Sequence, residues 1–197
     1  LRSAMKITPD FAKPYLRSLL DLATKSNLLN LKLSITQFLN LHDAAAEAAI
    51  ALYNEQSGNF QNLAFLDIAQ IEIARELRIR KKEKKDSWIL STEKLNDLMK
   101  KIDLQRKYNM FLCEKKLQIS SFSIFGSDIT KEPMVFLLFK EKYFELAFEF
   151  VFEFQIPMRV IGEKIIDILI SESDSSLINY ISILEEKESI EEMNKEK

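Results

Sequence analysis

Hydrophobic positions are densest between Tyr143 and Ile156, where the chain reads YFELAFEFVFEFQI before Pro157. Four phenylalanines in this stretch alternate as they would in a β-strand: Phe148, Phe150, Phe152 and Phe154. Three glutamates instead recur every four residues, which on a helix makes one narrow polar stripe: Glu145, Glu149 and Glu153. We predict a helix, because the run is longer than an average strand and both flanks have helical patterns.

Apolar residues recur at helical spacing along most of the remaining chain. They predict helices over residues 8–24, 27–40, 42–56, 60–77, 92–118, 132–139, 158–170 and 174–184. On the first of these helices, Tyr15 and Leu22 are expected on the apolar side. The predicted helix starts are Thr8-Pro9-Asp10, Ser26-Asn27, His42-Asp43 and Ser91-Thr92-Glu93, since such residues cap or begin helices. An ordered loop is expected over residues 119–129, because Phe122, Ile124 and Phe125 are too apolar to remain in water. The Glu/Lys-rich tail, residues 185–197, is expected to fray.

The composition favours an all-α fold. The chain has 197 residues with only three Gly and four Pro, which indicates long helices with few tight connections. Hydrophobic residues at 47% are sufficient for a buried core. The third predicted helix has an alanine-rich face that would let two helix axes approach closely, formed by Ala44, Ala45, Ala46, Ala48, Ala49 and Ala51.

A short internal repeat refines the fold prediction. Residues 60–65 and 143–148 share the pattern aromatic-x-x-Leu-Ala-Phe and lie 83 positions apart (143 − 60), roughly two helix pairs of a helical repeat. We predict an irregular α-solenoid of helix pairs, TPR-like or clathrin-repeat-like, with a closed helical bundle as the alternative. One domain would cover residues 1–184, with sub-units 1–88 and 89–184. In this interpretation the Ala of each motif lies where two helices cross. The main structural residues are then Phe60, Leu63, Ala64, Tyr143, Leu146, Ala147, Phe150 and Phe154.

Candidate chemistry is sparse. The single Cys113 excludes an internal disulfide and is expected to be packed in the fifth predicted helix. The only histidine, His42, precedes Asp43, but adjacent helical residues point in different directions, so a helix start is the preferred interpretation over a catalytic pair. The three glutamates of residues 145–153 lack the histidines of a bundle metal site. We therefore expect no enzyme activity, cofactor, metal or small-molecule substrate, and a reduced intracellular compartment.

A basic run lies at the end of the fourth predicted helix. Candidate contact residues there are Arg78, Arg80, Lys81, Lys82, Lys84 and Lys85. They could meet phosphates, although Glu76, Glu83 and Asp86 dilute the charge and cations also suit a helix C-terminus. A solvated helix end is the preferred interpretation. A binder of nucleic acid or acidic lipid through residues 75–85 stays as an alternative.

Several short motifs stand out in the second half of the chain. They are Ile124-Phe125-Gly126, Ala147-Phe148 and Phe154-Gln155-Ile156, preceded by a helix carrying Gln105, Tyr108, Phe111 and Leu112. Over roughly residues 91–184 this pattern resembles the C-terminal helical region of the spastizin family of FYVE-finger proteins. The resemblance implies a non-enzymatic scaffold that works in endosome, lysosome or autophagy-related membrane traffic. The implied partners are a spatacsin-like protein or an adaptor-complex subunit. The zinc-binding cysteines of the FYVE finger are absent, so lipid binding by that module is not implied.

Together these patterns predict a protein-interaction module, and the first residue, which is not Met, suggests a fragment of a larger protein. The expected location is cytoplasmic, peripheral to endosomes or lysosomes, with indirect membrane association and no nucleic acid partner. A helical accessory domain of a large kinase-like enzyme remains the other alternative.

Overall fold

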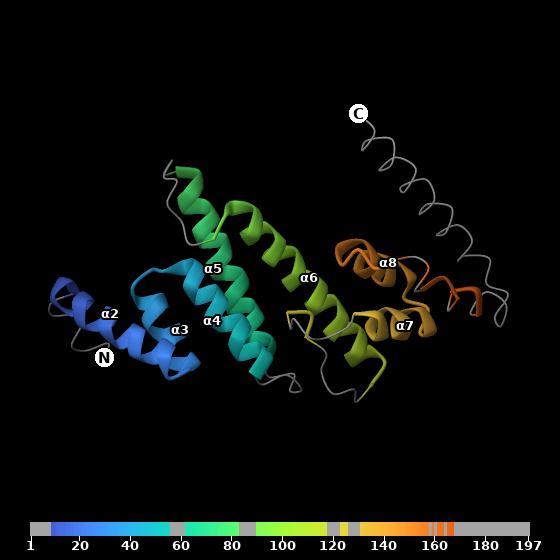
Figure 1. The fold of residues 1–197 in the computed structure, drawn as a ribbon, viewed down its shortest axis with the longest axis horizontal. Coiled ribbons are helices and arrows are strands. Elements are labelled where there is room, and N and C mark those ends of the chain that lie inside the picture. The colour runs from blue at the N-terminus through green and yellow to red at the C-terminus, as the bar shows by residue number, and fades with distance from the viewer. Residues whose placement is uncertain are drawn as a thin grey trace. The chain divides into compact units, whose positions relative to one another are not determined.

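The structure is a computed structural model that describes residues 9–55, 62–82, 90–117, 123–125, 131–157, 159, 161–163 and 165–167. All regular secondary structure in these residues is helical, which confirms the all-α prediction (Figure 1). The chain divides into two compact units, Leu1–Ser127 and Asp128–Lys197, and each is described by itself. Whether residues 1–184 act as one domain with a division at 88/89 stays a prediction. The predicted helix over 174–184 and the tail lie outside the described residues.

The first unit contains five described helices. They are α2 (Pro9–Lys25), α3 (Leu29–Phe38), α4 (His42–Glu55), α5 (Leu63–Lys82) and α6 (Thr92–Glu114). The main contacts join helices that follow one another in the chain, from α2 on α3 to α5 on α6. The core lies around α4 and α5, where Ala45, Ala46, Ala48 and Ala49 are fully buried. The alanine-rich face therefore packs against neighbouring helices, as predicted.

The second unit contains α7 (Glu132–Lys140) and α8 (Phe144–Glu153), which pack on each other. Helix α8 confirms the helical interpretation of the Phe-rich stretch. The Phe139 and Phe148 rings meet edge to face with centroids 5.3 Å apart, a favourable aromatic arrangement. Glu145 and Glu149 are exposed on the predicted polar stripe, together with Phe152. The described residues among 159–167 are also helical, in agreement with the next predicted helix.

Among the described helices, five end in the same way without glycine. In each, a residue two positions beyond the helix has a positive φ, between 49° and 64°: Asn27, Asn40, Lys116, Lys142 and Gln155. The following backbone N–H then bonds a carbonyl five residues back, as Leu28 does to Ala23 at 2.8 Å and Tyr143 to Leu138 at 2.9 Å. This is the Schellman motif, whose left-handed residue is usually Gly. The low Gly count therefore does not mean few tight connections.

These motifs also correct a predicted helix start. Asn27 does not cap α3. It ends α2, and the residue before α3, Leu28, makes no side-chain capping bond. The same kind of three-residue connection joins α2 to α3 (residues 26–28), α3 to α4 (39–41) and α7 to α8 (141–143). By contrast, the predicted start at Ser91 is confirmed, because its side chain accepts the Lys94 N–H at 3.2 Å.

Three side-chain predictions were wrong. Cys113 is exposed rather than packed, because α6 buries the opposite face through Tyr108, Phe111 and Leu112. In the internal repeat, Ala147 is fully buried but Ala64 is exposed, so the two motifs do not occupy equivalent positions. Phe60 lies outside the described residues. On the first predicted helix, Tyr15 and Leu22 were placed on the apolar side, yet they are 67% and 57% exposed.

Candidate interaction groove between α4 and α6

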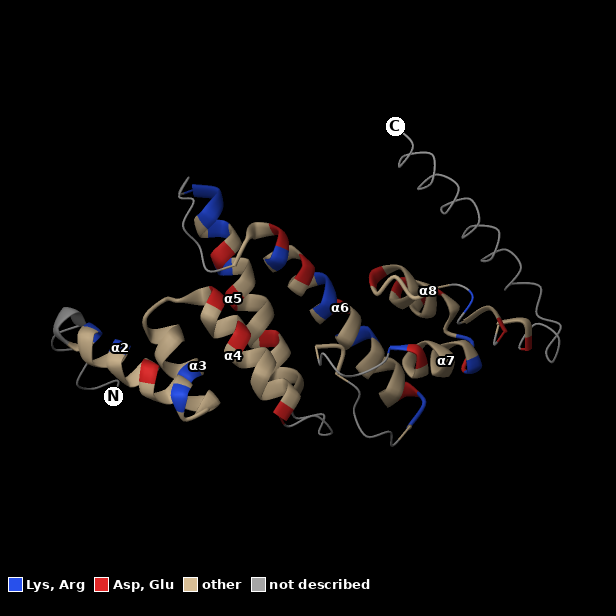
Figure 2. Ribbon diagram, viewed as in Figure 1, with Lys and Arg blue, Asp and Glu red and all other residues tan. Residues whose placement is uncertain are grey.

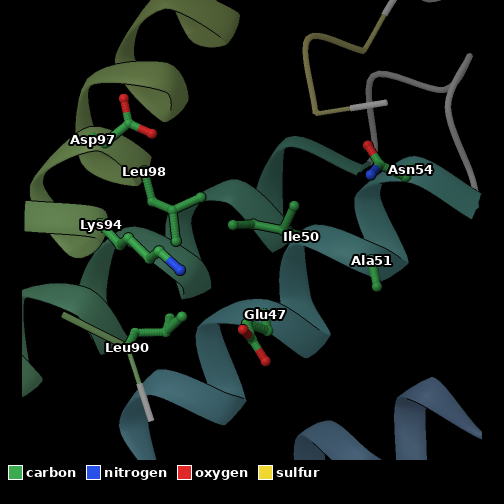
Figure 3. A pocket seen from close by; sticks show the side chains of 8 residues that line it. All are labelled: Glu47, Ile50, Ala51, Asn54, Leu90, Lys94, Asp97 and Leu98. Atoms are coloured by element: carbon green, nitrogen blue, oxygen red, sulfur yellow. The ribbon is translucent and has the colours of Figure 1, made fainter. Parts of the chain in front are cut away.

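A groove of 420 Å³ runs between α4 and α6 (Figure 3). Helix α4 contributes residues spaced i, i+3, i+4 and i+7, which form one stripe of a helix: Glu47, Ile50, Ala51 and Asn54. Helix α6 contributes Lys94, Asp97 and Leu98, and Leu90 lies just before its capping residue. Both walls are thus continuous helix faces with side chains that stand beside one another.

The floor of the groove is apolar and its rim is charged. Ile50 is buried, and Leu90 and Leu98 are partly buried against the main core. Figure 3 shows Ile50 and Leu98 pointing toward each other. Glu47 and Lys94 are exposed on opposite walls. An apolar floor with Glu47 on one wall and Lys94 on the other suits an amphipathic protein segment.

Arg80 on α5 holds Leu90, which lines the groove on the α6 side. Its Nη1 donates to the Leu90 carbonyl at 2.6 Å, and its Nε donates to Glu76 Oε1 at 2.8 Å. The Arg80 and Glu76 side chains are only 6% and 4% exposed. Asp43 Oδ2 lies 4.0 Å from Arg80 Nη2. The Arg80, Glu76 and Asp43 side chains form a charged cluster that is shielded from water. It therefore holds Leu90 more firmly than a surface ion pair would.

A second charged contact lies beside it at the start of α4. His42 Nδ1 and Glu72 Oε2 are 2.6 Å apart, with both side chains nearly buried. Glu72 also accepts hydrogen bonds from Gln37 at 3.1 Å and Arg75 at 2.9 Å. His42 therefore pairs with Glu72 and not with Asp43, whose Oδ1 accepts the Ala44 N–H at 2.8 Å. This arrangement links α3, α4 and α5.

The other end of α4 meets neutral polar groups. Asn109 Nδ2 donates to the Tyr53 hydroxyl at 3.0 Å, and its Oδ1 accepts from Gln105 Nε2 at 3.0 Å. Gln105 Oε1 accepts the Ile124 N–H at 2.8 Å. Asn54, which lines the groove, accepts a hydrogen bond from the Ser123 hydroxyl. These bonds confirm an ordered segment at 123–125 packed on the helices. Phe122 lies outside the described residues.

Burial also tunes two tyrosines in this region. It raises the pKa of Tyr108 to about 12. For Tyr53, burial raises the pKa while the hydrogen bond from Asn109 partly opposes that rise. Both phenols therefore stay protonated near neutral pH, and the Tyr53 hydroxyl serves as the acceptor for Asn109.

The basic run is divided by the structure. Arg78, Lys81 and Lys82 are exposed at the end of α5, where Figure 2 shows a gathering of basic residues. Arg80 belongs instead to the buried cluster with Glu76, so it is not available to a partner. Lys84 and Lys85 lie outside the described residues. The sequence analysis missed Glu72 and treated Glu76 only as a diluting charge, although both are buried on the stripe of α5 that carries Leu66, Ala69 and Ile73.

Within the described ranges, no group of three or more His, Cys, Asp or Glu is arranged to hold a metal ion. Of the described helices, none is both long and apolar enough to cross a membrane. Comparisons of the chain with protein families, with curated proteins and with solved structures find no match. The interpretation of the groove therefore rests on its own geometry.

Proposed function

We propose that this chain is a non-enzymatic helical scaffold that binds a partner protein in the α4–α6 groove. The observation that carries the proposal is the groove itself, with an apolar floor between two helix faces. Successive packing from α2 to α6 supports an irregular solenoid of helix pairs, an architecture that presents extended binding surfaces. The hydrogen-bonded clusters at both ends of α4 support a rigid frame for the groove.

The test uses one substitution at two positions. Ala51→Arg places a long charged side chain in the groove, whereas Ala64→Arg makes the same change at an exposed site on α5. Each 197-residue chain is immobilised, and proteins retained from a cell extract are quantified by mass spectrometry. We expect Ala51→Arg to reduce a specific partner at least tenfold and Ala64→Arg to retain it. Equal retention by wild type and both variants would contradict binding in the groove.

Membrane traffic is the setting that we propose for this scaffold. The support is the resemblance of residues 91–184 to the spastizin family, with a spatacsin-like or adaptor-complex subunit as the proposed partner. Proximity labelling from the full chain tests this proposal, with Ala51→Arg as the control. Labelling of endosomal or lysosomal proteins that disappears in the control would support it, and labelling unaffected by Ala51→Arg would count against it.

The exposed end of α5 favours a second candidate function, binding to acidic lipids or nucleic acid. Arg78, Lys81 and Lys82 make no side-chain hydrogen bond or ion pair with another described residue. Replacing all three by Glu should abolish any salt-sensitive binding to phosphoinositide liposomes or RNA. Arg80 is left unchanged in this variant, because altering it would disrupt the buried cluster. Binding that survives the triple change would exclude the α5 end as the site.

A further inference from the structure

We propose that the ligand of the groove is an amphipathic helix with a basic edge beside α4 and an acidic edge beside α6. The inference rests on the proposed function and specifies its partner. Two helix stripes form the walls, and a third helix can place its side chains between them, as ridges fit into grooves. The α4 stripe from Glu47 to Asn54 spans roughly 10 Å, about two helical turns. A ligand helix would therefore present apolar anchors at i, i+3, i+4 and i+7.

The charges of the rim specify the two edges of that helix. Glu47 stands exposed on the α4 wall and Lys94 on the α6 wall, and neither side chain bonds another described residue. Asp97 is different, because Lys101 on the same helix neutralises it at 2.7 Å. A Lys or Arg of the ligand would meet Glu47, and an Asp or Glu would meet Lys94. Exposed pairs add little affinity, but they select one partner and one orientation over others.

The groove is also prepared for a ligand before binding. Arg80 holds the Leu90 carbonyl, and the Ser91 cap fixes the first turn of α6, which carries Lys94. On the α4 side, the Asn54 side chain is held by Ser123. A wall that is already ordered loses less entropy when a ligand binds. The backbone that carries Lys94 and the Asn54 side chain are therefore fixed before the ligand binds.

The test uses three fluorescent, alanine-based helical peptides with the same leucine anchors. One has lysine on one edge and glutamate on the other, the second has lysine on both edges, and the third has glutamate on both. Affinities for the full chain are measured by anisotropy at low and physiological salt. We expect wild type to favour the mixed peptide by about two- to fivefold for each matched pair. Reversing the charge of either rim residue should change which peptide binds most tightly. Glu47→Lys should favour the all-glutamate peptide, and Lys94→Glu should favour the all-lysine peptide.

The controls separate this inference from the proposed function. Ala51→Arg should abolish binding of every peptide, while Ala64→Arg should leave it unchanged, and circular dichroism confirms that both variants fold. Equal affinities for the three peptides, or preferences unchanged by the two reversals, would overturn the proposed ligand. If no peptide binds but a cellular partner is still lost in Ala51→Arg, the scaffold function stands and the helical ligand is rejected. If cellular binding is also unaffected, both proposals fail.

Discussion

At its first turn α4 meets charged side chains, whereas at its last turns it meets neutral amides and hydroxyls. The charged cluster contains His42, Asp43, Glu72, Glu76 and Arg80. The neutral cluster contains Tyr53, Asn54, Gln105, Asn109 and Ser123. Each cluster ties α4 to elements distant in sequence, and each fixes a residue that lines the groove. The two clusters differ in the group that is left unpaired when one partner is removed: a buried ion in the first, and a neutral amide or hydroxyl in the second.

That difference follows from the cost of burial. An ion left without its partner in a buried site loses its compensating charge, which costs several kcal/mol. An unpaired amide or hydroxyl loses one hydrogen bond, which costs about 1–3 kcal/mol. The two ends of α4 therefore fix the groove with different tolerance to substitution.

The largest effect is expected from Arg80→Met. The change leaves Glu76, whose side chain is 4% exposed, without its cation and releases the Leu90 carbonyl. We expect the free energy of unfolding to fall by about 3–5 kcal/mol in urea denaturation. Arg78→Met, on the exposed side of the same helix, should cost less than about 0.5 kcal/mol.

A double variant checks the cause of this loss. Adding Glu76→Leu to Arg80→Met removes the uncompensated carboxylate and should recover much of the lost stability. If the double variant is less stable than Arg80→Met alone, the buried charge is not the source of the loss.

The next largest loss of stability is expected at alkaline pH and comes from Tyr108, on the same helix as Gln105 and Asn109. Burial raises the pKa of Tyr108 from 10.0 to about 12, so the unfolded chain loses the phenolic proton first. Stability from this group is complete below pH 10 and is lost as pH rises toward 12, by roughly 2–3 kcal/mol in all. Tyr108→Phe should reduce the pH slope of the unfolding free energy, measured in urea across that range, while Tyr53 retains a smaller slope of the same sign. Tyr15→Phe, at an exposed position, should retain the full slope, and identical slopes in all three chains would contradict the assignment.

A smaller loss is expected when the amide cluster is opened. Asn109→Ala removes the donor to Tyr53 and the acceptor for Gln105, both of which are buried. We expect the free energy of unfolding to fall by about 1–3 kcal/mol, less than for Arg80→Met. Asn30→Ala, at an exposed position on α3, is the surface control. A loss from Asn109→Ala equal to that from Arg80→Met would remove the distinction between the two clusters.

How much of this could be predicted from the sequence depends on whether a feature is local. Periodicity predicted the helices, the alanine face of α4 and the helical state of residues 144–153, because each is set by neighbouring residues. It did not find the pairing of Glu76 with Arg80, since a charged residue on a mostly apolar stripe has the same pattern whether it is paired or solvated. The groove was missed because its walls, α4 and α6, are separated in sequence by the whole of α5.

The helix ends were missed for another reason. The usual indicator is a glycine, yet these positions carry Asn, Lys or Gln. What the ends share is an apolar residue immediately after the left-handed one: Leu28, Leu41, Leu117, Tyr143 and Ile156. An apolar residue in that position often packs back on the helix, which offsets part of the backbone strain. The sequence pattern that could have located these helix ends is a polar residue followed by an apolar one, just beyond a segment with helical periodicity.

The smallest effect is expected when the left-handed residue at the end of α3 or of α6 is replaced by glycine. Asn40 precedes the charged cluster with φ 55°, and Lys116 ends α6, the helix of the amide cluster, with φ 53°. Asn tolerates the left-handed region better than Lys, so Lys116→Gly should stabilise the chain by about 1 kcal/mol and Asn40→Gly by only a few tenths. Thermal unfolding should show a midpoint raised by a few degrees for Lys116→Gly. An equal or larger gain from Asn40→Gly would mean that the connection into the charged cluster is the more strained of the two.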